Sequence, residues 1–152
     1  MSALAAPRLT AALSADHRDR LMNCASPADF PEGTRLFEES GYADRFWIVR
    51  TGTVTLDVPV PGRRPAVIDS VDAGELLGWS WLFPPYLWHF GAEAMTRVRA
   101  YEFEAATVRR LMDADPSFGS ALGHFVGQML AHRLVAARVR LLDLYAPHGS
   151  GR

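Results

Sequence analysis

The sequence predicts a mainly β domain, a sandwich or barrel-like roll with flanking helices. The first observation is length, because 152 residues suffice for one hydrophobic core and fall short of two full domains. The second is a change of pattern, from helical spacing before residue 27 to short β-type runs, and back to helical spacing after Phe103. Short strands separated by glycine or proline are typical of sandwiches and rolls.

We divide the chain into four segments on this pattern. Residues 1–26 are a helical lead-in, residues 27–104 the roll, residues 105–146 the C-terminal helices, and residues 147–152 a flexible tail. Within the lead-in, leucines recur at roughly helical spacing, and Ser14 is the expected N-cap of a short helix.

The roll is predicted from four β-type runs. They are "TRLFEE", "RFWIVRTGTVTLDV", "PAVIDSVDAGELLGW" and "YLWHFGAEAMTRVRAYEF". The stretch from Val60 to Ala66 is typical of a hairpin tip, in which Pro61 and Gly62 turn the chain.

Two helices are expected after the roll. "EAATVRRLMDAD" predicts a short helix, and residues 116–146 predict a long one with Asp115 as its cap and Pro116 in its first turn. The long helix carries a broad apolar stripe, namely Phe118, Leu122, Phe125, Val126, Met129, Leu130, Leu134, Val135, Val139 and Leu142. Since one side of a small roll covers less than this stripe, we expect a partner helix over the rest. The alternative is that the whole stripe packs on its own domain.

Composition excludes several classes of protein. With 49% hydrophobic residues, 22% charged residues and a net charge of -1, the chain resembles a folded soluble protein and not one that coats nucleic acid. The single Cys24 excludes an intrachain disulfide and a metal site built from several cysteines. Neither a secretion signal nor an apolar run of ~20 residues is present, so we expect a cytoplasmic protein without a membrane span.

Two long stretches resemble a known family. "FPEGTRLFEESGYADRFWIVRTGTVTLDV" is similar to the first half of the cyclic nucleotide-binding domain, as found in the sensor half of Crp/Fnr-type bacterial regulators. "TRVRAYEFEAATVRRLMDADP" is similar to the last strand of that domain and the short helix that follows it. The resemblance covers nearly the whole chain. It implies an eight-stranded antiparallel, jelly-roll-like β-roll with an N-terminal helix and a long C-terminal helix. Because that helix usually forms the dimer seam, we expect a homodimer through residues 116–146.

The family's phosphate-binding cassette corresponds to the segment from Gly74 to Ala94. The resemblance assigns ligand contacts to its first residues: Gly74, Glu75, Leu76, Leu77, Gly78, Trp79 and Ser80. By resemblance, Glu75 would accept a hydrogen bond from the ribose, and backbone N–H groups would meet the cyclic phosphate. The alternative is that Glu75 caps backbone amides of its own loop.

The second half of the cassette departs from the family. An arginine normally neutralises the phosphate there, and counting back from "AMTRVRAYEF" puts Trp88 or His89 at its position. Arg97 or Arg99 from the next strand is a candidate replacement, but Val98 between them has the character of a core residue and predicts that both point outward.

The long helix also lacks the polar pair that reads adenine in family members. The corresponding positions fall near Arg133 and Leu134 or near Ala136 and Ala137. We interpret three arginines of this helix as its solvent-facing side: Arg133, Arg138 and Arg140.

Aromatic side chains occupy the second half of the cassette, where family members have the arginine that binds the phosphate. We expect the pocket to be formed by Trp81, Trp88, His89 and Phe90. Such rings either fill a pocket themselves or line it for a flat, weakly polar ligand.

No catalytic constellation with convincing spacing is present, so we predict a non-enzymatic sensor without cofactor or metal, with a cyclic nucleotide or another small molecule as its ligand. The alternatives are a ligand-free dimeric interaction module with an aromatic-filled pocket, or a binder of a more apolar ligand. The chain stops soon after the long helix, so we expect no helix-turn-helix contact with DNA and an unidentified downstream protein as partner.

Overall fold

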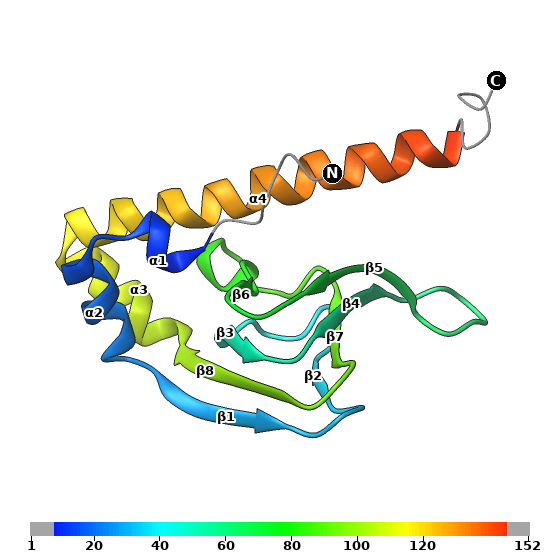
Figure 1. The fold of residues 1–152 in the computed structure, drawn as a ribbon, viewed down its shortest axis with the longest axis horizontal. Helices are drawn as coiled ribbons and strands as arrows, with labels where there is room; N and C mark the ends of the chain where they lie inside the picture. Colours follow the sequence, from blue (N-terminus) through cyan, green and yellow to red (C-terminus); the bar gives the residue numbers. More distant parts are fainter. Residues whose placement is uncertain (1–7, 146–152) are drawn as a thin grey trace.

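The computed structural model describes residues 8–145, so the expectations for the first seven residues and for the tail lie outside the described part of the chain. Within that part, eight strands form two four-stranded antiparallel sheets (Figure 1). One sheet has the order β1 (Ser26–Phe30), β8 (Val98–Glu104), β3 (Arg45–Thr51) and β6 (Leu76–Leu77). The other has the order β2 (Arg35–Phe37), β7 (Gly91–Ala94), β4 (Val54–Val58) and β5 (Ala66–Val71). The predicted eight-stranded roll is therefore confirmed.

Helices flank the roll at both ends of its sequence, as predicted. The short α1 (Leu9–Ala12) and α2 (Ala15–Met22) precede it, and α3 (Ala105–Ala114) and α4 (Pro116–Tyr145) follow it. Ser14 accepts a hydrogen bond from the backbone N–H of His17 at 3.2 Å, which confirms the first cap. Asp115 likewise accepts from the backbone N–H of Phe118 at 3.2 Å, so a carboxylate satisfies an otherwise unpaired donor at the start of α4.

Alternate residues of β3 pack into two separate aromatic groups. Phe46 stacks on Phe103 and on Trp81, with ring centroids 4.8 and 4.0 Å apart. Trp47 stacks on Phe37, with ring centroids 5.8 Å apart, and Phe37 stacks in turn on Trp88. Because successive side chains of a strand point to opposite faces of its sheet, the two groups lie on the two sides of β3.

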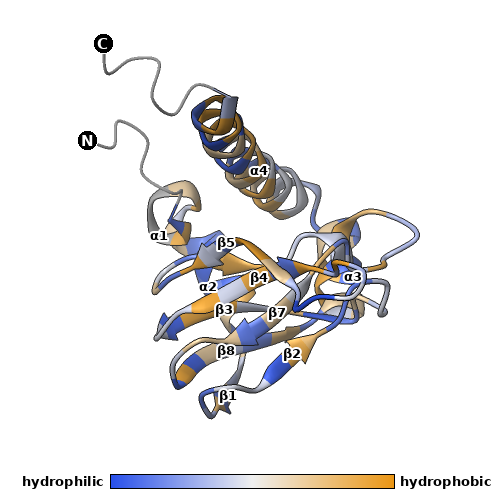
Figure 2. Cartoon of the chain, turned by 90° about the vertical axis from the view of Figure 1, so that its right-hand side faces the viewer, coloured by the Kyte–Doolittle hydropathy of each residue, from blue (hydrophilic) through white to orange (hydrophobic). Residues whose placement is uncertain are grey.

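The long helix α4 has a buried half and an exposed half. Its buried residues are Phe118, Leu122, Phe125, Val126 and Met129. Apolar residues in the second half remain exposed: Leu134, Val135, Val139, Leu141, Leu142 and Leu144. In Figure 1 this half continues past the other helices, and in Figure 2 apolar segments recur along all of α4. The part of the predicted stripe beyond Leu130 is thus not covered by the described residues of its own chain.

The β-type run expected from Tyr86 is wrong for its first residues. β7 begins only at Gly91, and the chain before it forms the short helix η1 (Ser80–Leu82) and a loop. Two physical features stop a strand here. Pro84 and Pro85 cannot donate to a strand ladder, and Tyr86 has a φ of +59°, in the left-handed region.

The helices described between residues 8 and 145 include none with the length and hydropathy needed to span a membrane.

Candidate functional site

A cavity of about 310 Å³ lies between the roll and the second half of α4. Its lining residues come from β4 and β5, from the cassette segment and from α4: Leu56, Ile68, Asp69, Trp79, Phe90, Leu130, Arg133, Leu134, Ala137 and Arg140. The volume is at the lower end of the range of roughly 300–1,000 Å³ that is common for small-molecule sites. The walls are mostly apolar, with three charged side chains.

The strand register places one of these charged side chains, Asp69, on the face of the sheet that lines the cavity. Asp69 of β5 lies directly opposite Leu56 of β4, which in turn lies opposite Ala92 of β7. Directly opposed residues of an antiparallel pair point to the same face. Asp69 therefore shares the face of the buried Leu56 and Ala92, although it sits in a strand whose other residues are largely exposed.

Arg133 of α4 reaches Asp69 across the cavity wall. Its Nη1 donates to Oδ2 of Asp69 at 2.5 Å and to the carbonyl oxygen of Ser70 at 3.4 Å. The two side chains are only 17% and 22% exposed. Nη1 of Arg140 lies 4.0 Å from the other carboxylate oxygen of Asp69. These contacts join α4 to β5.

The interpretation of Arg133 as a solvent-facing residue is wrong. Its side chain points to β5, because Asp69 of that strand lies beside this part of α4 and accepts its hydrogen bond. The exposed Arg138 agrees with the sequence interpretation. Arg133 and Arg140 are seven residues apart, a spacing that places both on one face of a helix. The seven-residue spacing was the signal in the sequence for a shared face of the helix. It does not show which part of the roll that face contacts.

The electrostatic balance of the cavity favours an anion. Two guanidinium groups face one carboxylate, so the lining carries a net positive charge. Guanidinium groups form strong, directional hydrogen bonds with phosphate and carboxylate groups. Trp79 and Phe90 add aromatic surface beside these charges.

Trp79 is held in place by its aromatic neighbours. Its ring stacks on His89 with the centroids 4.8 Å apart, and it meets the edge of Phe83 at 6.1 Å. Nδ1 of His89 lies 3.1 Å from the hydroxyl of Ser80, which is fully buried. The Ser80 hydroxyl is thus engaged by His89, and the exposed histidine ring supports the outer face of Trp79.

Trp81 and Trp88 are core residues and do not line this cavity. Trp81 is fully buried, its Nε1 donates to the carbonyl of Gly78 at 3.0 Å, and its own carbonyl accepts from Arg109 at 2.5 Å. Trp88 is 4% exposed and stacks on Phe37 at 3.8 Å. Of the four predicted pocket aromatics, Phe90 lines the cavity.

The first turn of the cassette has a fixed internal structure. Gly74 and Gly78 have φ values of +86° and +102°, which favour glycine. A Cβ on Gly78 would also lie 2.8 Å from the ring of Trp88. Between them, Leu76 and Leu77 form β6 and are buried against β3.

Glu75 makes the contact that the capping alternative requires. Its Oε1 accepts a hydrogen bond from the backbone N–H of Asp72 at 2.7 Å. The side chain is half-buried and does not line the cavity beside α4. A contact between Glu75 and a ribose stays a prediction, as do the ligand contacts of the other cassette residues. Of the seven, Trp79 lines the cavity.

Neither candidate replacement from β8 and its preceding turn lines the cavity. Val98 is fully buried and Arg97 and Arg99 are exposed, which confirms the predicted outward orientation. Nη2 of Arg97 donates to Asp29 at 2.6 Å.

Among residues 8–145 there is no cluster of three histidine, cysteine or acidic residues suited to a metal ion.

Comparisons with known proteins agree with this architecture. The model of the cyclic nucleotide-binding domain matches residues 27–115, more than half of the chain. The CRP-like cAMP-activated global transcriptional regulators of two Mycobacterium tuberculosis strains are 27% identical over 126 residues, which cover 83% of this chain and 54% of theirs. The chain thus spans about half the length of the curated relatives it matches.

Solved structures give the same result. A candidate cyclic nucleotide-binding protein from Geobacter metallireducens has a TM-score of 0.74 and 25% identity, over 84% of this chain and 92% of that one. The N-terminal domain of a transcriptional regulator from Streptomyces coelicolor has a TM-score of 0.68 and 26% identity, over 83% and 88%. A cyclic nucleotide-binding domain from Methylobacillus flagellatus, 18% identical with a TM-score of 0.78 over 86% and 74%, shares the fold. The chain belongs to the cyclic nucleotide-binding domain family.

Proposed function

We propose that this domain is a regulatory sensor that binds a small anion with a flat, largely apolar body in the cavity between the roll and α4. The observation that carries the proposal is the placement of Arg133 and Arg140 beside Trp79 and Phe90. Family membership and the cAMP-activated relatives make cAMP and cGMP the first candidates. A more apolar anion is the second candidate.

Arg133 and Arg140 would supply the positive charge that the cassette lacks. The two residues at the position of the missing arginine cannot do so, because Trp88 is a buried core residue and His89 is turned to Ser80. The two helix arginines line the cavity and carry permanent charge. The ligand's anion would compete with Asp69 for these groups.

The same contact offers a route from binding to regulation. Without ligand, Arg133 holds α4 against β5 through Asp69. An anion that draws Arg133 away from Asp69 would replace one contact between helix and roll with another. A ligand shifts a conformational equilibrium only by such differential contacts. The position of α4 would then report occupancy of the cavity to a downstream protein.

We further propose that α4 forms the seam of a homodimer. Its exposed half carries six apolar side chains that residues 8–145 leave uncovered. A second copy of α4 would bury them in a helix pair, and burial of apolar surface is the main driving force of such association. Leu134 lines the cavity and is 72% exposed, so the seam and the ligand site would adjoin.

The test is a calorimetric titration with cAMP and with cGMP at low salt, where a weak anion site is not screened. We expect micromolar binding, weakened about tenfold or more in Arg133→Gln because a charge-assisted contact is lost. Arg138→Gln is the matched control, since Arg138 is on the same helix and does not line the cavity. Binding that is unaffected by Arg133→Gln would refute the role of Arg133.

Absence of heat and of any thermal shift with both nucleotides would refute cyclic nucleotides as ligands. Aromatic carboxylates would then be titrated against the same two variants. If these also fail to bind, the sensor proposal is wrong, and a dimeric interaction module without ligand takes its place.

A further inference from the structure

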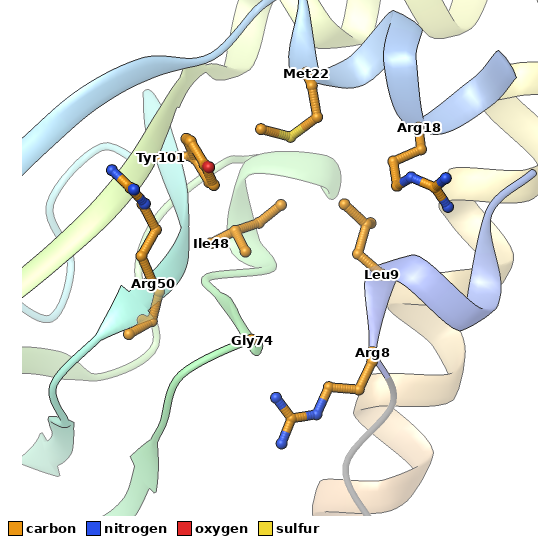
Figure 3. A pocket seen from close by; sticks show the side chains of 9 residues that line it. Arg8, Leu9, Arg18, Met22, Ile48, Arg50, Gly74 and Tyr101 are labelled. Carbon is orange, nitrogen blue, oxygen red and sulfur yellow. The ribbon is translucent and has the colours of Figure 1, made fainter. Parts of the chain in front are cut away.

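A second, larger cavity lies between the N-terminal helices and the sheet that contains β3 and β8. Its volume is about 530 Å³, and it shares no lining residue with the cavity beside α4. The lining residues, shown in Figure 3, are Arg8, Leu9, Arg18, Met22, Ile48, Val49, Arg50, Gly74 and Tyr101. They come from the start of α1, from α2, from β3 and β8, and from the turn before β6.

The floor of this cavity is apolar. Ile48 of β3 lies directly opposite Tyr101 of β8, so the two side chains share a face of the sheet. Leu9 of α1 and Met22 of α2 approach the same space from the helices (Figure 3). Ile48 and Leu9 are buried, and Met22 and Tyr101 are half-buried. The result is a hydrophobic surface that remains open to a visiting molecule.

Arginines surround this floor. Figure 3 shows Arg8, Arg18 and Arg50 on three sides of the apolar group. The guanidinium of Arg50 lies 4.9 Å from the ring centroid of Tyr101, and Nη1 of Arg8 donates to the carbonyl of Ala73 at 2.5 Å. The nine lining residues include no carboxylate.

Two of these arginines have no ion-pair partner among residues 8–145. The ion pairs found among residues 8–145 involve neither Arg8 nor Arg50, and both side chains are exposed. The guanidinium group of Arg50 lies over the ring of Tyr101, and that of Arg8 donates to the backbone carbonyl of Ala73. Both contacts are with uncharged groups. A cluster of cations over an apolar floor attracts a molecule that has both an anionic and an apolar part.

We propose that this cavity binds an amphipathic carboxylate, with its head among the arginines and its tail or ring on the floor of Ile48 and Tyr101. A carboxylate matches the planar, forked geometry of a guanidinium group. The tail gains free energy because binding moves its apolar surface out of water and onto this floor. The lining offers arginine donors and the Tyr101 hydroxyl and no carboxylate or amide side chain, a set of hydrogen-bond donors that matches a carboxylate head.

The experiment is a calorimetric titration of the full chain with sodium decanoate, decanol, butyrate and decyl phosphate. We expect one decanoate bound per chain. Decanol lacks the charge and butyrate lacks the tail, so each is expected to bind at least about tenfold more weakly. Equal binding of decanol and decanoate would overturn the role of the arginines. Tighter binding of decyl phosphate would overturn the choice of a carboxylate.

Two variants locate the site. Arg50→Gln removes one cation, and Met22→Glu places a carboxylate beside the floor; each is expected to weaken decanoate binding about tenfold or more. Arg63→Gln, at the exposed tip between β4 and β5, is the matched control and is expected to bind as the unchanged protein does. Thermal unfolding of each variant establishes that it is folded. Decanoate binding that both variants leave unchanged, or no binding at millimolar decanoate, would overturn the proposal.

Discussion

Arg133 and Asp69 are 64 positions apart in sequence and are joined by a hydrogen bond of 2.5 Å. One residue belongs to the long helix α4 and the other to β5 of the roll. Their side chains are 17% and 22% exposed, so the pair is partly shielded from solvent. The cavity between the roll and α4 therefore has an arginine that α4 contributes.

Asp69→Asn is predicted to strengthen anion binding. The substitution removes the carboxylate that now partners Arg133 and Arg140, so both would be available to the ligand. We expect the Kd for cAMP to fall about three- to tenfold, measured by calorimetry at low salt. The free energy of unfolding should fall by about 1 kcal/mol, because a partly exposed ion pair contributes little.

Asp29→Asn is the control for this substitution, since Asp29 pairs with the exposed Arg97 and neither residue lines the cavity. It should leave the Kd unchanged. A rise in the Kd of Asp69→Asn would mean that Asp69 itself contacts the ligand, contrary to the proposed role.

Substitutions at Glu75 are predicted to separate its loop contact from any ligand contact. Glutamine retains an oxygen that can accept from the backbone N–H of Asp72, whereas alanine does not. Glu75→Ala should lower the free energy of unfolding by about 1 kcal/mol, and Glu75→Gln by less than about half of that. Urea unfolding measures both.

The Kd of Glu75→Gln for cAMP shows whether Glu75 also contacts the ligand. A loss of affinity with stability retained would indicate a contact between Glu75 and the ribose. An unchanged Kd would show that Glu75 only caps its loop.

Arg35→Met is predicted to be among the more destabilising changes of a polar residue in the roll. Arg35 of β2 donates to Asp57 of β4 at 2.6 and 3.1 Å, and the Asp57 side chain is only 7% exposed. Removing the arginine leaves a buried carboxylate without its cation, so we expect a loss of about 3 kcal/mol in urea unfolding. Arg45→Met is the control, because its pair with Glu102 is more exposed and is expected to contribute at most about 1 kcal/mol.

The stabilisation by Arg35 should not depend on pH near neutrality. Hydrogen bonding to Asp57, and then to Glu38, raises the pKa of Arg35 above its usual value. A group whose pKa is raised on folding contributes its stability at every pH below the unfolded value, which for arginine is above about 12. The loss in Arg35→Met should therefore be equal at pH 6 and pH 9. A loss that differs between these values would contradict the assigned cause.

Leu142→Glu is predicted to convert a dimer into a monomer. Leu142 is 59% exposed in the second half of α4, and a glutamate there would bring charge into an apolar helix pair. We expect the mass measured by light scattering to halve at micromolar concentration. Met95→Glu, at an exposed apolar residue between β7 and β8, should leave the mass unchanged. A monomeric parent protein would refute the proposed seam.

The sequence determined much of the fold through local patterns. The β-type runs, the hairpin tip before Ala66 and the caps at Ser14 and Asp115 depend on neighbouring residues. Each is present in the structure, except for the first residues of the run expected from Tyr86. Helix and strand periods and capping preferences act over a few residues, which is why they can be identified from the chain alone. The apolar stripe of α4 likewise predicted a helix that its own roll covers only in part.

The placement of the aromatic residues was decided by tertiary structure. Trp81, Trp88 and Phe90 are close in sequence, yet the first packs with Phe46, the second with Phe37 on the other side of β3, and the third lines a cavity. The irregular segment around Pro84 and Pro85 has no regular period, so alternation along it cannot assign faces. Those positions depend on partners contributed by distant strands.

The sequence by itself determined a β-roll and its flanking helices, and its resemblance to the family predicts a cassette without the usual arginine. Only the tertiary structure decided which cation stands at the cavity. Arg133 and the exposed Arg138 belong to the same helix, and their surroundings differ because the turn of α4 that carries Arg133 meets Asp69 of β5. An ion pair between residues so far apart depends on how two elements pack, and local sequence carries little information about that packing.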